Sequence, residues 1–83
     1  MNQTRKNRNT WEIYSEILSE TTKQPKRLTD LAYAVRSNHA CTQKYMKTLV
    51  RFGLLTKQDR YYTPTEKGKT YLSYFREMEG LLT

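Results

Sequence analysis

The stretch that decides the fold is residues 29–52, TDLAYAVRSNHACTQKYMKTLVRF. It predicts two short helices that meet at a corner formed by Arg36, Ser37 and Asn38, where either Ser37 or Asn38 can cap the second helix. Placed at about 100° per residue, residues 39–52 separate into an apolar face, which is expected to enter a core, and a polar face. The apolar face carries Thr42, Tyr45, Met46, Leu49 and Val50.

The polar face of this second helix is basic, and no acid lies near it in the sequence. From Leu31 to Gln58 the chain has five Lys and Arg residues and no Asp or Glu. Lysine and amide side chains on one helix face suit the base edges of a DNA major groove, so the face predicts a nucleic-acid contact. A solvated basic face without a partner is the alternative, and Arg51 can simply complement the helix dipole. The face comprises Ala40, Gln43, Lys44, Lys47 and Arg51.

The sequence before this stretch predicts one further helix and a break. Asn9 followed by Glu12 is typical of a helix cap, and the apolar spacing that follows predicts a helix over about 10–21. Pro25 ends this helix, and Thr29 is expected to cap the next one. Three glutamates spaced four residues apart give the first helix an acidic outer face, which is expected to point away from any nucleic acid.

After Gly53, which suits the left-handed geometry at a helix end, the periodicity changes. Residues 54–64 alternate β-prone Leu, Thr and Tyr and predict a hairpin of two short strands. The strands are expected to join around Gln58 and Asp59, although this pair lacks the glycine common in tight turns.

The last part of the chain predicts an apolar helix over about 65–82, capped by Thr65, in which Gly68 allows close approach to a neighbour. Its apolar residues exceed what one neighbouring element covers, so we expect them to join two copies of the chain. Packing against the first helix of the same chain is the alternative. The expected dimer residues are Tyr71, Leu72, Tyr74, Phe75, Met78, Leu81 and Leu82.

Length, charge and cysteine content bound the function. Eighty-three residues predict one domain, over residues 9–83, behind a basic arm of residues 1–8. The net charge of +7 favours a polyanionic partner, either nucleic acid or an anionic membrane surface. The sequence has no apolar run of membrane-spanning length and no segment of signal-peptide type, so we expect a cytoplasmic, nucleoid-associated protein without a membrane partner. Cys41 is the one cysteine, which indicates a reducing compartment.

The basic arm carries Arg5, Lys6 and Arg8 and no acid, among Asn, Gln and Thr residues that cannot form a core. It is expected to be flexible. A simple disordered start and an arm that follows phosphates beside the main site are both consistent with this composition.

Residues with catalytic or metal-binding chemistry are scarce. His39 and Cys41 lie close together, but two ligands without a second cluster make a poor metal site, so no metal or cofactor is expected and Cys41 is interpreted as a partly buried spacer. The sequence shows no paired carboxylates in an apolar setting, no Gly-rich phosphate loop and no triad-like set, so neither an enzyme nor a small-molecule substrate is expected. The tyrosines are expected mostly to pack, with Tyr61 or Tyr62 inside the hairpin, rather than to stack on single-stranded bases.

The order helix, helix, corner, helix, two-stranded hairpin, helix is that of a winged helix-turn-helix (α-α-α-β-β-α), a mainly α fold with a short β-hairpin. Residues 8–79 resemble the small archaeal winged-helix DNA-binding proteins, a group that includes regulators, chromatin-associated proteins and virus- or plasmid-encoded relatives. The most specific motifs are YMKTLVRFGLL at residues 45–55 and TEKG at residues 65–68. IYSEIL at residues 13–18 and TDLAYAVRSN at residues 29–38 also match.

This resemblance implies binding of double-stranded DNA, usually as a homodimer joined through the C-terminal helix. The helix at about 39–52 would lie in the major groove and the hairpin would lie beside the backbone, with Tyr33 also able to reach phosphates. Carried over residue by residue, the DNA contacts fall on Arg36, Ser37, Asn38, His39, Ala40, Gln43, Lys44, Lys47, Lys57 and Arg60.

The sequence therefore favours a DNA-binding transcriptional regulator or architectural factor. The alternative, from another class, is a winged-helix protein-interaction module whose apolar last helix docks a different protein. RNA is less favoured as a partner, because an A-form major groove is too narrow to admit a helix.

Overall fold

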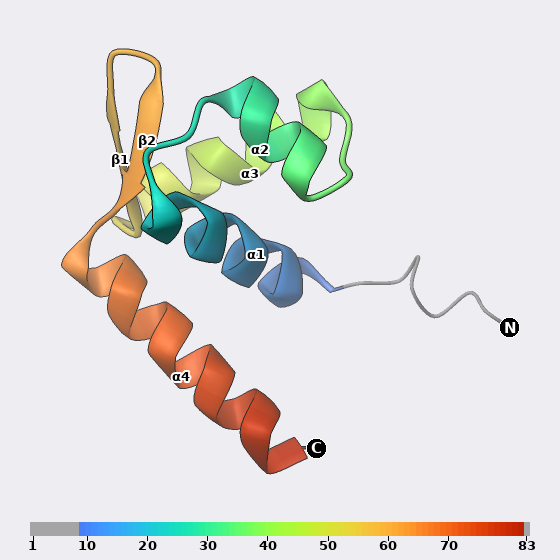
Figure 1. Cartoon of the computed structure of the whole chain (residues 1–83), viewed down its shortest axis with the longest axis vertical. Helices are drawn as coiled ribbons and strands as arrows, with labels where there is room; N and C mark the ends of the chain where they lie inside the picture. Colours follow the sequence, from blue (N-terminus) through green and yellow to red (C-terminus); the bar gives the residue numbers. More distant parts are fainter. Residues whose placement is uncertain (1–8, 83) are drawn as a thin grey trace, which may run out of the picture.

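Four helices and a two-stranded hairpin follow one another along residues 9–82, the part of the chain that the computed structural model describes (Figure 1). The order is α-α-α-β-β-α, so the predicted winged helix-turn-helix fold is confirmed. The expected basic arm, residues 1–8, lies outside the described residues, as does the side chain of Leu82. The elements are α1 (Thr10–Lys23), α2 (Leu28–Ala34), α3 (His39–Arg51), β1 (Leu55–Gln58), β2 (Tyr61–Pro64) and α4 (Glu66–Leu82).

The first helix begins with the predicted cap. Asn9 Oδ1 accepts a hydrogen bond from the backbone N–H of Glu12 at 2.8 Å, and the Glu12 carboxylate accepts one from the N–H of Asn9 at 3.0 Å. The helix continues to Lys23, slightly past its predicted end, and stops where Pro25 forces Gln24 into an extended conformation.

The second helix begins two residues earlier than its predicted cap allows. Arg27 is the N-cap and Leu28 is the first helical residue, so the assignment of Thr29 as the cap is wrong. Asp30 explains the difference, because its carboxylate accepts a hydrogen bond from the backbone N–H of Arg27 at 3.3 Å and so stabilises the first turn.

The corner between α2 and α3 is tight. Arg36 adopts the left-handed region with φ of 57°, and the backbone N–H of Ser37 donates back to the carbonyl of Ala32 at 3.0 Å. Asn38, and not Ser37, caps α3, because Asn38 Oδ1 accepts the N–H of Cys41 at 2.7 Å. Both features fix the direction in which α3 leaves the corner.

The end of α3 shows the predicted glycine geometry. Gly53 has φ of 79°, its N–H donates to the carbonyl of Val50, and the N–H of Leu54 donates to the carbonyl of Leu49. This pair of hydrogen bonds satisfies the last carbonyls of the helix and turns the chain into the hairpin.

The hairpin pairs its strands antiparallel, with Gln58 opposite Tyr61. The turn is therefore formed by Asp59 and Arg60, one residue later than predicted. Asp59 takes the left-handed conformation, with φ of 58°, that its short polar side chain tolerates in place of glycine.

The linker between α1 and α2 is fastened to the hairpin. The N–H of Lys26 donates to the carbonyl of Tyr62 at 3.2 Å, and the N–H of Tyr62 donates to the carbonyl of Lys26 at 2.7 Å. Lys26 Nζ also lies 3.1 Å from the Glu20 carboxylate, which in turn contacts Lys23 Nζ at 3.2 Å. These hydrogen bonds and ion pairs hold the pKa of Glu20 below its usual value.

A single core joins all four helices and the hairpin. Val50 was expected inside it but is 39% exposed, because it lies at the edge of the buried row of α3. Tyr62 is the tyrosine on the inner face of the hairpin, whereas Tyr61 is exposed. Leu72, expected at a dimer contact, is only 5% exposed and belongs to this core, so little of its side chain remains for a contact between copies. The core residues are Ile13, Tyr14, Ile17, Leu18, Leu31, Val35, Met46, Leu49, Leu54, Leu55, Tyr62 and Leu72.

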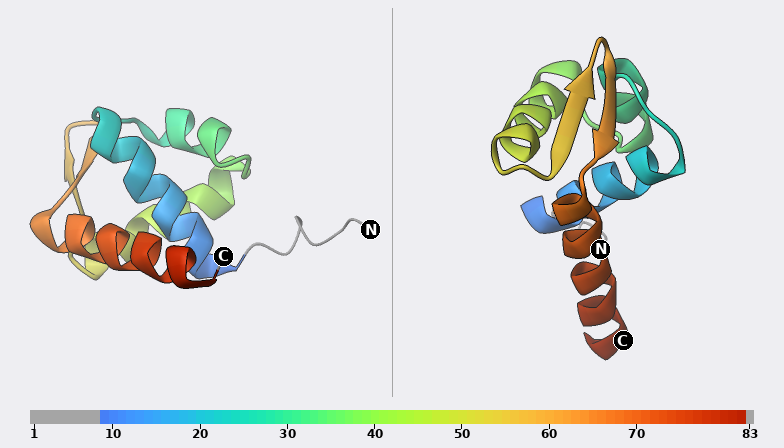
Figure 2. Two further views of the ribbon diagram at one scale, coloured as in Figure 1. Left: turned by 60° about the horizontal axis from the view of Figure 1, so that its bottom comes forward. Right: turned by 90° about the vertical axis from the view of Figure 1, so that its left-hand side faces the viewer.

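The last helix starts against the end of α3 and then runs away from the body (Figure 2). Thr65 caps it as predicted, accepting the N–H of Gly68 at 3.0 Å and donating to the carbonyl of Gly53 at 2.6 Å. The close approach predicted for Gly68 is confirmed, since a Cβ there would lie 2.1 Å from the carbonyl oxygen of Leu54. Tyr71 then ties α4 to α1 by donating to the carbonyl of Trp11 at 3.1 Å.

We expect Gly68→Ala to lower the free energy of unfolding by about 1–3 kcal/mol, because the added methyl group meets a backbone oxygen that the α3 end holds in place. Urea denaturation measures the change. Gly80→Ala is the matched control, since a Cβ at Gly80 meets nothing within 4 Å. The control should be neutral or stabilise by up to about 1 kcal/mol, and equal effects at the two glycines would contradict the close packing of α4.

We expect Glu20→Gln to lower stability by about 0.5–1 kcal/mol at neutral pH, through loss of the two lysine contacts. Because the folded pKa of Glu20 lies below the unfolded value of 4.5, this contribution is complete above that value and is lost as the pH falls through the folded pKa. Denaturation of both chains between pH 7 and pH 2 should therefore give unfolding curves that differ at the start and converge in acid. A difference that persists at the acid end would refute the assignment.

Candidate nucleic-acid interface

The polar face of α3 is exposed along its whole length. The opposite row, Thr42, Met46 and Leu49, is fully buried, and the Thr42 hydroxyl is satisfied because it donates to the carbonyl of Asn38 at 2.8 Å. Burial of this row fixes the rotation of the helix, so its basic side must face solvent. The exposed residues of this face are His39, Ala40, Gln43, Lys44, Lys47 and Arg51.

Near the start of α3, the burial of one residue differs from the expectation. Cys41 was expected to be partly buried but is exposed. It lies on a flank of the helix where Tyr45, one turn later, is itself only half-buried, so no element covers the thiol. The solvent-exposed face of α3 therefore includes Cys41 as well as the basic side chains.

The corner contributes three of the predicted contact residues in different settings. Ser37 is half-buried, whereas Asn38 is exposed and uses its side-chain oxygen for the helix cap. Arg36 is exposed but lines, with Glu16 and Glu20, a hollow of about 360 Å³ between α1 and α2. Arg36 thus lies at the boundary between the basic surface of α3 and the acidic surface of α1.

The hairpin adds two further cations. Lys57 Nζ lies 5.6 Å from the centroid of the Tyr62 ring, a cation–π contact that holds the lysine against its strand. Arg60 is exposed in the turn. On α2, the side chain of Tyr33 is 88% exposed, which is unusual for a large aromatic residue without a partner surface.

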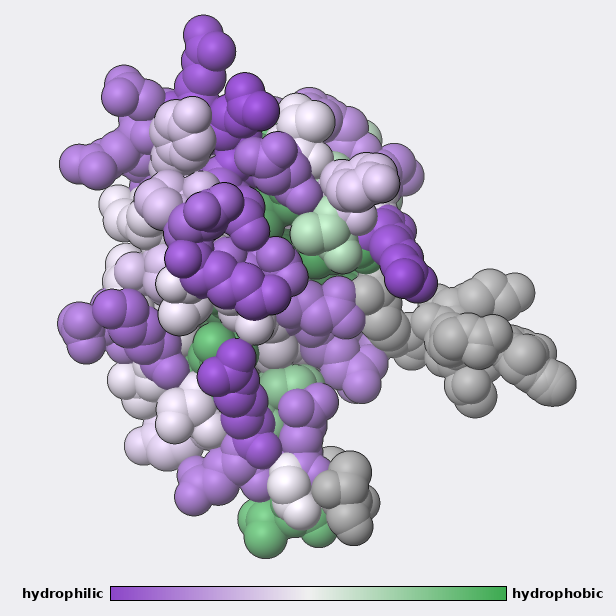
Figure 3. Space-filling model, in the orientation of Figure 1, coloured by the Kyte–Doolittle hydropathy of each residue, from purple (hydrophilic) through white to green (hydrophobic). Residues whose placement is uncertain are grey.

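Acidic groups are concentrated elsewhere in the molecule. Within α3 and β1 there is no Asp or Glu, whereas Glu12, Glu16 and Glu20 lie along α1. Figure 3 shows hydrophilic residues over most of the visible face, with an apolar group of atoms at the far end of α4. Among the described residues, the basic side chains of α3 therefore lie on a different element from the acidic side chains of α1, while α4 carries charges of both signs.

Metal-ion clusters and membrane-spanning helices are the two other features that bear on function. Across residues 9–82 there is no group of three or more His, Cys, Asp or Glu side chains arranged to hold a metal ion. None of the helices found in that range combines the length and apolar character needed to cross a membrane.

A helix-turn-helix with an exposed basic helix and an adjoining hairpin defines the class of protein. The chain belongs to the winged helix-turn-helix family, whose model matches residues 7–83. This membership agrees with the expectation of a protein that is not an enzyme.

Solved structures that are similar to the chain include those of two DNA-binding or regulatory proteins. The crystal structure of Sso10a-2, a DNA-binding protein from Sulfolobus solfataricus, matches 89% of this chain and 81% of its own length, with 29% identity and a TM-score of 0.75. The adhesin competence repressor AdcR from Streptococcus pyogenes matches with 26% identity and a TM-score of 0.70, covering 95% of this chain and 65% of that one. A His-tagged AdcR structure gives 30% identity and a TM-score of 0.67, over 90% and 59% of the two chains. No curated protein sequence matches.

Proposed function

We propose that the protein binds double-stranded DNA, with α3 in the major groove and the hairpin beside the phosphate backbone. The observation that carries the proposal is the exposed face of α3, on which Gln43, Lys44 and Lys47 lie together with no acid in the helix. The likeness to Sso10a-2, which is described as a DNA-binding protein, supports the same function.

The side chains on this face have the chemistry for base contacts. Gln43 can form paired hydrogen bonds with adenine, and Lys44 and Lys47 can reach the O6 and N7 atoms of guanine. Ala40 adds no bulk to the first turn, so the helix start can approach the groove floor, where its methyl group suits thymine.

Phosphate contacts would come from the surrounding elements. Arg60 and Lys57 on the hairpin and Tyr33 on α2 would meet the backbone beside the groove that α3 enters. Ser37, Asn38 and His39 would meet it at the helix start, where backbone N–H groups favour phosphate oxygens. Arg36 would serve at the edge of the interface.

We also propose that two copies associate through α4. Tyr74, Met78 and Leu81 are exposed on this helix, with Leu81 84% exposed, and the half-buried Tyr71 and Phe75 continue the apolar surface. A two-fold dimer would present two α3 helices about 34 Å apart, one turn of the double helix. Such a dimer would suit a transcriptional regulator or a nucleoid-associated architectural factor, and the similarity to a repressor supports the regulatory role.

The exposed face of α4 also favours a second candidate, a module that docks a different protein. The two functions differ in their behaviour with DNA alone. The second candidate would be favoured if the chain does not shift duplex DNA in a gel but associates with a protein partner through Tyr74 and Met78.

Lys44→Ala combined with Lys47→Ala is expected to weaken duplex binding by at least about tenfold, because both cations face the DNA. If six to ten phosphates are contacted, raising salt from about 50 to 200 mM should weaken wild-type binding by roughly 10³–10⁵-fold. Fluorescence anisotropy with a labelled duplex gives both quantities.

Lys23→Ala combined with Lys69→Ala is the matched control. It removes the same charge from two lysines that pair locally with Glu20 and Glu66, outside the proposed interface. The control should bind within about threefold of wild type. Equal losses in both variants would remove α3 from the DNA face. A wild-type affinity that does not change with salt would contradict the proposed DNA binding.

Tyr74→Glu combined with Met78→Glu is expected to convert the dimer into a monomer, because each carboxylate would be buried in the apolar seam. Light scattering at micromolar concentration should show the molecular mass falling by half. Ser73→Glu, on an exposed polar position of the same helix, should keep the dimer mass. A wild-type chain that is already a monomer at this concentration would contradict the seam.

A further inference from the structure

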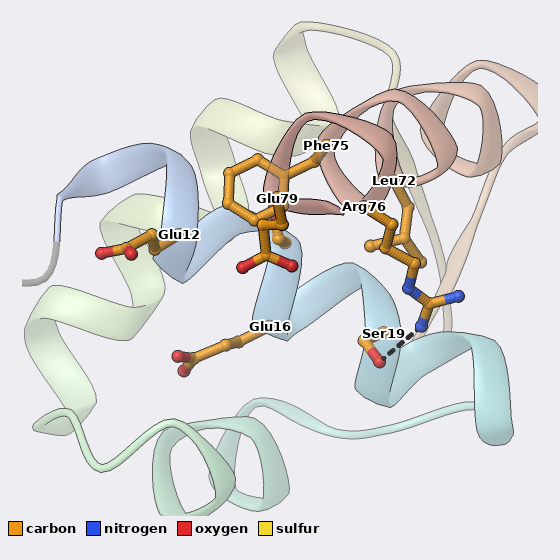
Figure 4. Close-up of a pocket in the computed structure, with 8 residues that line it drawn as sticks. Glu12, Glu16, Ser19, Leu72, Phe75, Arg76 and Glu79 are labelled. Atoms are coloured by element: carbon orange, nitrogen blue, oxygen red, sulfur yellow. Dashed lines mark hydrogen bonds between the residues drawn. The ribbon is translucent and has the colours of Figure 1, made fainter. Parts of the chain in front are cut away.

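A groove of about 220 Å³ runs between α1 and α4, apart from the α3 face. Its apolar lining comes from Leu72 and Phe75. In Figure 4 the carboxylates of Glu12, Glu16 and Glu79 lie toward one end, whereas Arg76 closes the other end by donating a hydrogen bond to Ser19 Oγ at 3.2 Å. The groove therefore has an acidic end with an aromatic ring beside it.

The acidic end lies where the amino-terminal residues join the domain. Of the carboxylates that line the groove, Glu12 lies in the first turn of α1 and Glu79 lies in the last part of α4. The Glu12 carboxylate accepts the backbone N–H of Asn9 at 3.0 Å, which places a groove carboxylate next to the residue that follows position 8.

Residues 1–8 match this end of the groove in charge and in length. They carry Arg5, Lys6 and Arg8 and no acid, against three carboxylates in the groove. Eight extended residues reach about 26 Å, and the helix from Glu12 to Ser19 is only about 10 Å long. The aliphatic stems and cationic ends of Arg and Lys also suit contact with an aromatic ring such as Phe75.

We propose that residues 1–8 dock in the acidic end of the α1/α4 groove of the same chain, and that DNA competes for them. A tethered segment has an effective concentration in the millimolar range, so weak ionic contacts suffice to hold it. Duplex DNA presents one negative charge per about 1.7 Å and outcompetes three carboxylates.

Docking thus restrains DNA binding by the chain itself. The segment can add its own contacts to DNA only when it is released, so docking in three of every four molecules lowers the gain in affinity from these contacts about fourfold. This consequence rests on the proposed DNA binding, whereas the docking contact does not.

A spin label tests the docking directly. A nitroxide on Gln3→Cys, in a Cys41→Ser chain at about 0.01 M salt where the Debye length is about 30 Å, should broaden the amide NMR signals of Glu16 and Glu79. The broadening should disappear in Glu16→Gln/Glu79→Gln. It should persist in the matched control Glu66→Gln/Glu77→Gln, which removes two acids of α4 that do not line the groove.

Three outcomes would overturn the proposal. The broadening could centre on α2 or the hairpin, or it could survive loss of the groove carboxylates. It could also arise only between molecules when spin-labelled and isotope-labelled chains are mixed, which would place the segment on a second copy.

Duplex titrations test the consequence. Both charge variants should gain affinity from weaker repulsion, but Glu16→Gln/Glu79→Gln should gain about fourfold more than the control. This extra gain should vanish when Arg5, Lys6 and Arg8 are changed to Gln, and an extra gain that remains would overturn the competition. A chain that binds no duplex at all would refute the proposed function, while the spin-label result would still decide the docking.

Discussion

Burial of one row of α3 is the constraint on which the rest of the molecule depends. Thr42, Met46 and Leu49 have no exposed surface, and they are held between the other elements of the core. A helix locked in rotation by three buried side chains can present only one opposite face, and in this chain that face is cationic. The Asn38 cap and the Gly53 turn fix the two ends of the same helix, so its position is determined along its axis as well as around it.

α3 carries only basic charged side chains, whereas those of α1 are mainly acidic. The acids of α1 lie on a helix that contributes Ile17 and Leu18 to the core through its other side, so the acidic surface and the basic surface are backed by the same apolar interior. In a small protein this arrangement gives an electric dipole that orients the molecule toward a polyanion before contact. The same separation creates an acidic surface that can compete with that polyanion for cationic segments of the chain.

Much of the fold could be predicted because its signals are local. Asn9, Gly53, Thr65 and Gly68 each act within a few residues or through a strict steric need, and each occupies its predicted role. A prediction failed where a helix start was stabilised by a residue other than the expected cap. The start of α2 depends on Asp30 and not on Thr29.

Burial in the candidate site was harder to predict than its location. The basic residues of α3 lie together as expected, but spacing alone gives only the direction of a side chain, not whether another element covers it. Val50 and Cys41 lie on flanks of the helix that stay open, while Leu72 is covered by the core. The hollow shared by Arg36, Glu16 and Glu20 depends on how α1 and α2 cross, which no periodicity in the sequence encodes.

The joint at the end of α3 has a mechanical consequence. Thr65 donates to the carbonyl of Gly53, its own N–H donates to the carbonyl of Leu54, and Lys67 Nζ donates to the carbonyl of Phe52 at 3.0 Å. Three successive carbonyls are therefore clamped by the first turn of α4, with no slack linker between the two helices. The angle between α3 and α4 is therefore fixed at this joint, so the direction in which α4 projects from the body is set by the orientation of the cationic helix.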